Sequence, residues 1–251
     1  MKRVLVALAA AIAMSSSAYA ADLGAKPVYK APPVMVAYNW SGVYVGGHVG
    51  WGWQQADATL LASPSPAFPL GTVFETRADG ILAGGQIGVN WQTGNWVFGL
   101  EGDFSWTNAD GSVTSAGALA VGALVLTGTI DFNWLATATG RVGYAANNWL
   151  FYVKGGAAFT DFDIGGTVAT LGVLTNTVNT LSDTRTGWTV GAGIEHGFAG
   201  NWSWKVEYNY MDFGSETYNL TATPAAGVTT INHDLTVHAV KFGVNYRFGP
   251  M

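Results

Sequence analysis

The sequence has no cysteine, few charged residues and no long apolar run after its first twenty residues. Without cysteine, the chain can form no disulfide bond, thiolate nucleophile or lipidated N-terminal cysteine. Charged residues make up only 11% of the chain and the net charge is −5, which does not favour nucleic acid as a partner. No later stretch reaches the ~18 uninterrupted apolar residues of a membrane-spanning helix. The hydrophobic residues, 49% of the chain, must therefore be accommodated in another way.

Residues 1–20 have the features of a secretory signal peptide: a charged start at Lys2 and Arg3, a short apolar core and a small-x-small cleavage triplet. A membrane anchor is disfavoured because the apolar run is too short to cross a bilayer. Residues 21–39 contain three prolines, which cannot donate to a sheet ladder, so an extended segment outside the sheet is predicted. Residues 40–251 are predicted to form the folded domain.

In that domain, large apolar side chains alternate with small or polar ones over about ten residues at a time, as in Phe242, Gly243, Val244, Asn245 and Tyr246. Alternation places the two kinds of side chain on opposite faces of a strand. The length suits the roughly 9–11 residues that a tilted strand needs to cross a bilayer. Strands are predicted at 40–53, 79–91, 96–106, 129–144, 149–159, 184–198, 202–210 and 235–248.

Long connections, such as the predicted loops at 107–128, 163–183 and 214–233, alternate with turns of three or four residues. This asymmetry is typical of bacterial outer-membrane barrels, which have short periplasmic turns and long external loops. Aromatic residues stand at the strand ends on the short-turn side and are predicted to form an interfacial girdle. They are Trp40, Trp91, Trp96, Tyr144, Trp149, Phe198, Trp202 and Phe248.

A soluble up-and-down barrel is the alternative, with its aromatic face pointing inward. An eight-stranded barrel is only just wide enough for ordinary side chains, and about four to six large residues per strand would not fit. The opposite face is rich in glycine, which suits a crowded lumen. The predicted fold is therefore all-β: a transmembrane antiparallel up-and-down β-barrel of about eight strands.

The faces predicted to line the lumen carry charges of both signs. They are Glu101, Asp103, Asp131, Arg141, Lys154, Arg185, Glu195, Lys205, Glu207, Lys241 and Arg247. Charges deep in a narrow barrel persist only when they are paired or hydrated, so a structural network is predicted, with Glu101 meeting Arg141 across neighbouring strands. The alternative, a selectivity lining for a pore, is disfavoured because eight strands rarely leave an open channel.

Two stretches carry a resemblance to a known family. Residues 39–47, Asn-Trp-Ser-Gly-Val-Tyr-Val-Gly-Gly, open the first strand, and residues 241–248, Lys-Phe-Gly-Val-Asn-Tyr-Arg-Phe, close the last. Together with the signal peptide and the proline-containing segment, they make the whole chain resemble the alphaproteobacterial outer-membrane immunogenic protein family. The resemblance implies an eight-stranded, OmpA-like barrel of the "porin family", a group that includes surface antigens and haemin-binding proteins.

Three functions are compatible with these features. The favoured one is a structural, surface-exposed outer-membrane barrel that supports envelope integrity and presents extracellular loops. The second is a narrow porin-like channel for small solutes, and the third, implied only by the resemblance, is haem binding at the surface. Catalysis is not expected, because no serine and histidine share one outer rim. No metal or cofactor is expected either, because the histidines (His48, His196, His233 and His238) lack ligand spacing.

The expected location is the cell outer membrane. The expected partners are outer-membrane lipids, the outer-membrane assembly machinery and an extracellular ligand at the loops. Nucleic acid is not among them.

Overall fold

The computed structural model describes residues 38–62, 69–119, 122–170, 173–223 and 228–249. The predicted signal peptide and most of the segment 21–39 lie outside these residues. Nine strands occupy nearly all of the described chain: β1 (Gly42–Ala62), β2 (Val73–Thr93), β3 (Trp96–Thr107), β4 (Asp110–Leu119), β5 (Gly122–Ala146), β6 (Trp149–Thr170), β7 (Val173–Ala199), β8 (Trp202–Thr223) and β9 (Val228–Phe248). This part of the chain contains no helix that is long and apolar enough to cross a membrane.

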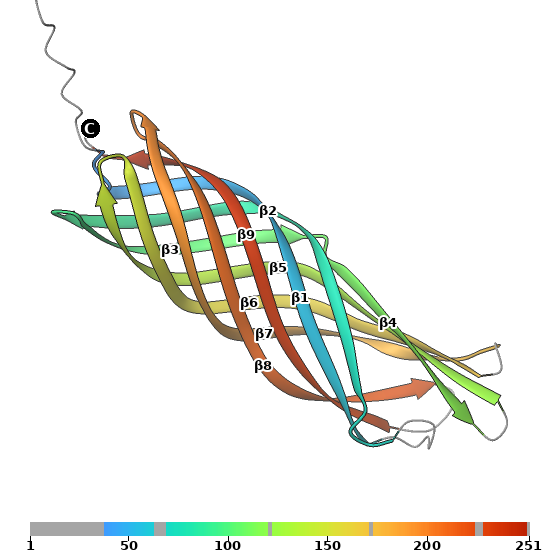
Figure 1. Ribbon diagram of the computed structural model, residues 1–251. Helices are drawn as coiled ribbons and strands as arrows, with labels where there is room; N and C mark the ends of the chain where they lie inside the picture. The colour runs from blue at the N-terminus through green and yellow to red at the C-terminus, as the bar shows by residue number, and fades with distance from the viewer. Residues whose placement is uncertain (1–37, 63–68, 120–121, 171–172, 224–227, 250–251) are drawn as a thin grey trace, which may run out of the picture. The chain divides into compact units, whose positions relative to one another are not determined.

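The strands form one antiparallel sheet that closes on itself (Figure 1). Around the ring the order is β1, β9, β8, β7, β6, β5, β3 and β2, and β2 pairs again with β1. β4 continues β3 after a break at Asn108 and Ala109 and pairs with β5 along its whole length. Because β3 and β4 share one position, the nine strands fill eight positions, which confirms the predicted up-and-down barrel.

One end of the ring, here called the turn end, carries the short turns between β2 and β3, β5 and β6, and β7 and β8. Residues with positive φ, which tight turns require, lie in all three: Gly94, Asn147 and Gly200. The opposite end is here called the hairpin end, because long two-stranded hairpins extend from it (Figure 1).

The predicted loops at 107–128, 163–183 and 214–233 are wrong, since most of these residues belong to strands. Of these residues, Asn108 and Ala109 lie between β3 and β4, and residues 120–121, 171–172 and 224–227 lie outside the described residues. The prediction had limited each strand to the length that crosses a bilayer. Threonine and valine, which favour strands, continue the pairing well beyond that length.

The chemistry of the side chains that point into the ring changes along each strand. On β9, Leu235, Val237, Lys241 and Arg247 are all buried inside the ring. Toward the turn end the inward residues are charged and the outward ones apolar, as in a membrane barrel. Toward the hairpin end the inward residues form an apolar core and the outward face is polar, as in a water-soluble barrel. This hairpin-end core comprises Ala56, Ala78, Leu82, Ala109, Ile130, Phe132, Leu135, Ala158, Phe162, Ile164, Met211, Phe213, Leu235, Val237 and Ala239.

A β-bulge on β5 overturns one predicted lumen residue. The register with β6 shifts between Phe132 and Trp134, so Asn133 is an extra residue that reverses the facing of everything before it. Phe132 therefore points into the core, and Asp131, predicted to line the lumen, is exposed on the outside. Strict alternation carried through Asn133 gave the wrong face.

Candidate functional site

Ten of the eleven charges predicted in the lumen are buried inside the ring, and Asp131 is the exception. They are Glu101, Asp103, Arg141, Lys154, Arg185, Glu195, Lys205, Glu207, Lys241 and Arg247. Eight of them form one network in the half of the barrel near the turn end. Arg185 lies apart in the hairpin-end core, and Arg247 lies at the turn end.

Glu101 on β3 is the centre of the network. Its carboxylate lies 2.8 Å from Lys154 Nζ, 3.1 Å from Lys205 Nζ and 3.6 Å from Arg141 Nη1. Tyr44 Oη donates a further hydrogen bond to it at 2.7 Å. One buried carboxylate thus faces three cations, so it requires other acids nearby to balance them.

Three other carboxylates supply that balance. Glu207 lies 2.8 Å from Lys154 Nζ and 3.3 Å from Lys205 Nζ. Asp103 lies 2.7 Å from Lys241 Nζ, and Glu195 lies 3.4 Å from Arg141 Nη1. Four acids therefore meet four cations with no net charge. Most of these contacts cross the lumen between strands that are not neighbours, because the barrel is narrow enough for long side chains to span it.

Two tyrosines enclose Arg141 and connect it to the acids. The guanidinium carbon lies 4.7 Å from the Tyr44 ring centre and 5.2 Å from that of Tyr152, a cation–π geometry. Tyr152 Oη donates to Glu207 at 2.7 Å. Each ring lies over a glycine, and a Cβ added at Gly193 would stand only 2.6 Å from Tyr152 Oη. The inward glycine is therefore required by close packing.

We expect Gly193→Ala to lower the free energy of unfolding by about 1–3 kcal/mol, because the new methyl group must displace Tyr152 and its bond to Glu207. Urea unfolding of the protein in lipid vesicles measures the change. The matched control is Gly140→Ala on the outer face, where the nearest atom would be 4.0 Å away and the cost should stay within about 0.5 kcal/mol. Equal costs at the two sites would contradict the packing argument.

Trp40, which the sequence analysis assigns to the outer girdle, lies buried inside the ring at the turn end. Trp40 is completely buried and precedes β1, which begins at Gly42, whose φ is +127°. Its backbone N–H donates to Gln92 Oε1 at 2.7 Å. Arg247 lies 4.8 Å from the Trp40 ring and 4.5 Å from the Tyr38 ring, and donates to the Asn39 carbonyl. The girdle assignment of Trp40 is therefore wrong.

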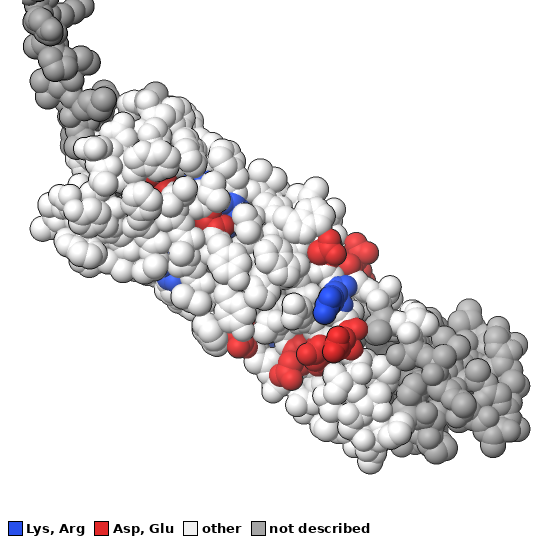
Figure 2. Space-filling model, in the orientation of Figure 1, with Lys and Arg blue, Asp and Glu red and all other residues white. Residues whose placement is uncertain are grey.

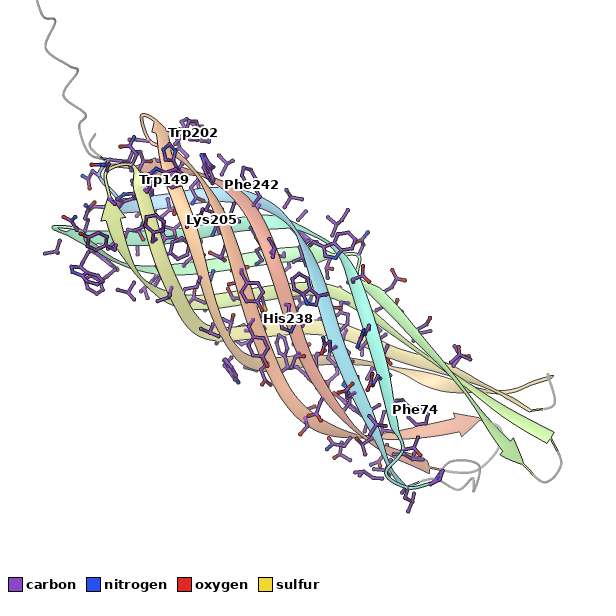
Figure 3. The ribbon with its side chains drawn as sticks, in the orientation of Figure 1. Phe74, Trp149, Trp202, Lys205, His238 and Phe242 are labelled. Atoms are coloured by element: carbon purple, nitrogen blue, oxygen red, sulfur yellow. The ribbon has the colours of Figure 1, made fainter. Side chains whose placement is uncertain are left out.

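The seven other predicted girdle residues are exposed on the outer face, and Figure 3 shows Trp149 and Trp202 at the turn end. Their contact with a membrane interface stays a prediction. A second group of aromatic residues, which sequence reasoning missed, lies about ten residues further along the strands. Trp51, Trp106 and Trp188 are exposed there. The sequence does indicate this second group, since each of these residues stands at or near one end of a predicted apolar run.

A serine–histidine pair lies within the lumen, where reasoning limited to the rims missed it. His48 Nε2 is 2.7 Å from Ser105 Oγ, and His48 Nδ1 is 2.6 Å from Gln86 Oε1. Ser105 has no exposed surface, so a substrate could reach it only by displacing packed side chains. An amide also stands where a catalytic triad has a carboxylate. In the described part of the chain, no group of His, Cys, Asp or Glu is arranged to hold a metal ion.

The outer face toward the hairpin end carries rows of acids that directly oppose one another on adjacent strands. One row joins Glu75, Asp57 and Asp234 across β2, β1 and β9. Another runs across β2, β4, β5 and β6, through Asp79, Asp110, Asp131 and Asp163. Figure 2 shows acidic side chains gathered toward that end, whereas most of the rest of the visible surface is uncharged. Like charges in directly opposed positions are destabilising.

Comparison with known proteins identifies the family to which the chain is similar. Residues 6–248 match the model of the outer membrane protein beta-barrel domain. The chain is 31% identical to the 31 kDa outer-membrane immunogenic protein of Brucella melitensis, covering 99% of this chain and all of that one. It is 29% identical to the 22 kDa outer membrane protein of Rhizobium leguminosarum bv. viciae, covering 86% and 82%.

Among solved structures, the outer membrane protein OprG from Pseudomonas aeruginosa is similar, with 12% identity, coverage of 84% of this chain and 98% of that one, and a TM-score of 0.47. The family resemblance inferred from the opening and closing strands is confirmed, and so is the outer-membrane location. The chain belongs to the outer membrane protein β-barrel family.

Proposed function

We propose that this outer-membrane protein is a closed structural barrel, which supports the envelope and presents its hairpins outside the cell. The observation that carries the proposal is the filled interior. The half near the turn end contains the balanced network around Glu101, and the other half contains the hairpin-end core. Paired charges and packed apolar groups along the lumen support a barrel without a continuous polar path for solutes.

The alternatives have less support. Haem capture needs an accessible axial ligand. His48 uses both ring nitrogens, and His238 Nδ1 bonds to Tyr208 Oη at 2.8 Å. The Nδ1 atoms of His196 and His233 have no partner, but both are buried. Catalysis needs an accessible nucleophile, and Ser105 is fully buried. A titration of the purified protein with haem, followed by the absorbance of the bound form, would reveal such a site.

Conductance across a planar bilayer tests the proposal directly. Refolded protein, with insertion verified by protease protection, should give no stable channel, because ions cannot displace the paired charges of the lumen. Removing the central cation with Lys154→Ala should produce brief leaks, since three acids then lose a partner. A large, steady and ion-selective conductance of the unaltered protein would instead favour the porin-like function.

The orientation follows from the lengths of the connections, with the turn end in the periplasm and the hairpins outside. We expect peptide tags inserted at 63–68, 120–121, 171–172 or 224–227 to bind antibody on intact cells. Tags at 94–95 or 147–148 should bind only after the outer membrane is permeabilised. Labelling in the opposite pattern would reverse the orientation. The relative from Brucella melitensis is named an immunogenic protein, which agrees with surface exposure.

A further inference from the structure

His233 is a buried histidine within the hairpin end of the barrel. It lies on β9 and is only 5% exposed. Its ring stacks on Phe162 of β6, with centroids 6.1 Å apart, and meets the Tyr218 ring of β8 edge-on at 6.3 Å. Its Nδ1 atom is buried without a hydrogen-bond partner. Buried polar atoms nearly always have a partner, so this one requires an explanation.

The charged side chain that donates a hydrogen bond to His233 is a cation, Arg185. Arg185 of β7 is buried beside it, 5.4 Å from the Phe162 ring centre and 5.3 Å from that of Tyr218. The guanidinium donates to the His233 carbonyl at 3.0 Å and to Tyr218 Oη at 3.1 Å. This arrangement fixes Arg185 in place, so it cannot retreat if a second positive charge forms next to it.

The acids around the site are directed to other partners. Asp183 accepts a hydrogen bond from Tyr218 Oη, and the exposed Glu216 lies 3.7 Å from Arg185 Nε. β6 contributes Phe162 itself, and the neighbouring Asp161 and Asp163 bond Asn133 on the outer face. In the strand register His233 lies opposite the uncharged Ala58 of β1 and opposite Glu216 of β8, and Asp234 of β9 is exposed. No carboxylate among the described residues is paired with the ring.

We propose that His233 is an acid-triggered release for the hairpin end of the barrel. At neutral pH the uncharged ring completes the apolar core. In mild acid an imidazolium beside Arg185 can be accommodated only by hydration, so the hairpins separate from one another around it. The separation would expose Phe162, Ile164 and Phe213, an apolar surface that the cell presents only in acid. The half near the turn end would stay closed.

The sign of the pH effect follows from the difference between the pKa of His233 in the closed form and in the open form. Burial, and secondarily the Arg185 charge, lower the pKa of His233 from its ordinary value of about 6.5 to about 4. The closed form is thus fully favoured above about pH 6.5 and loses stability as the pH falls toward 4. Relative to pH 8, the open-to-closed ratio should rise about 30-fold at pH 5. Protonation of the acid rows on the outer face stabilises the closed form instead, because it relieves the repulsion between the opposed carboxylates.

Hydrogen exchange followed by mass spectrometry tests the proposal on the full chain in lipid vesicles. After correction for the intrinsic exchange rate, protection of 158–164 and 231–237 should fall about 30-fold between pH 8 and pH 5. Residues 96–104 should keep their protection. His233→Phe, which keeps an aromatic ring but cannot titrate, should abolish the fall. His238→Phe is the control on the same strand, and it should leave the fall unchanged.

Two results would overturn the proposal: hairpin protection that is flat from pH 8 to pH 5, or an undiminished fall in the His233→Phe variant. If that variant does not fold, the ring of His233 in the unaltered protein can be titrated by NMR. A midpoint near pH 4 would support the proposal, whereas a midpoint between pH 6 and pH 7 would show a ring that protonates in place without opening the core.

Discussion

Replacing Lys241 with methionine should destabilise the barrel by about 3–5 kcal/mol, the typical cost of leaving a buried charge without its partner. Lys241 Nζ lies 2.7 Å from Asp103 Oδ1, and both side chains are almost completely buried. Without the ammonium group, Asp103 retains only a longer contact with Lys154 at 3.6 Å and the hydroxyl of Thr137. The network then carries an excess negative charge in a space that water enters poorly. Urea unfolding in lipid vesicles measures the loss.

The pair supplies its own control. Asp103→Asn alone should cost a similar amount, because Lys241 then loses its acid, but the double variant D103N/K241M restores the balance of charge. It should therefore be more stable than either single variant. This cycle is cleaner than one on Glu101 and Arg141, whose charges are shared among several partners. Additive costs in the double variant would mean that the two residues act independently.

Leu100→Arg should cost about 2–4 kcal/mol, the penalty for arginine at the bilayer midplane on the outer face of a barrel. Leu100 is 57% exposed and stands on β3 between Trp96 and Trp106, which belong to the two aromatic groups. An arginine near the centre of this span can reach neither interface. Phe98, two residues from Trp96, lies closer to an interface, so Phe98→Arg should cost less.

Val73→Arg is the matched control for this prediction. Val73 is 53% exposed on β2 but lies toward the hairpin end, beyond the second aromatic group. The substitution there should change stability by no more than about 0.5 kcal/mol. If arginine at Leu100 proved equally mild, the span between the two aromatic groups would not be the part of the barrel that meets lipid.

Local alternation was enough to predict the turn-end part of the strands, the ring and the inward facing of ten charges, because side-chain direction on a strand depends only on parity. It failed at Asp131 because an inserted residue such as Asn133 reverses parity without any distinctive side chain. The contact partners of the charges could not be predicted either. Lys154 meets Glu207 across the lumen, and that depends on the width and closure of the ring.

The change of polarity along each strand was visible in the sequence but was not used. On β9 the inward positions read Leu235, Val237 and Ala239 before Lys241, a switch from apolar to charged on one face. On β9 these apolar positions lie inside the predicted strand, whereas the core residues Ala109 and Ile164 fall in the predicted loops at 107–128 and 163–183, because the prediction ends each strand at the bilayer length. If the alternation of side chains is followed beyond the bilayer length, it indicates the hairpin-end core.

Because of the opposed carboxylates on the outer face, the stability of the hairpin end should depend on salt concentration more strongly than that of the half near the turn end. The lumen charges are enclosed, so dissolved ions screen them little. The rows through Asp57 and Asp131 lie in water, where the hairpin end behaves as a small polyelectrolyte whose cohesion depends on its counter-ion atmosphere. Low ionic strength should therefore weaken the packing of the outer hairpins and leave the half near the turn end unchanged. The salt concentration around the cell thus determines how tightly the outermost part of the protein is closed.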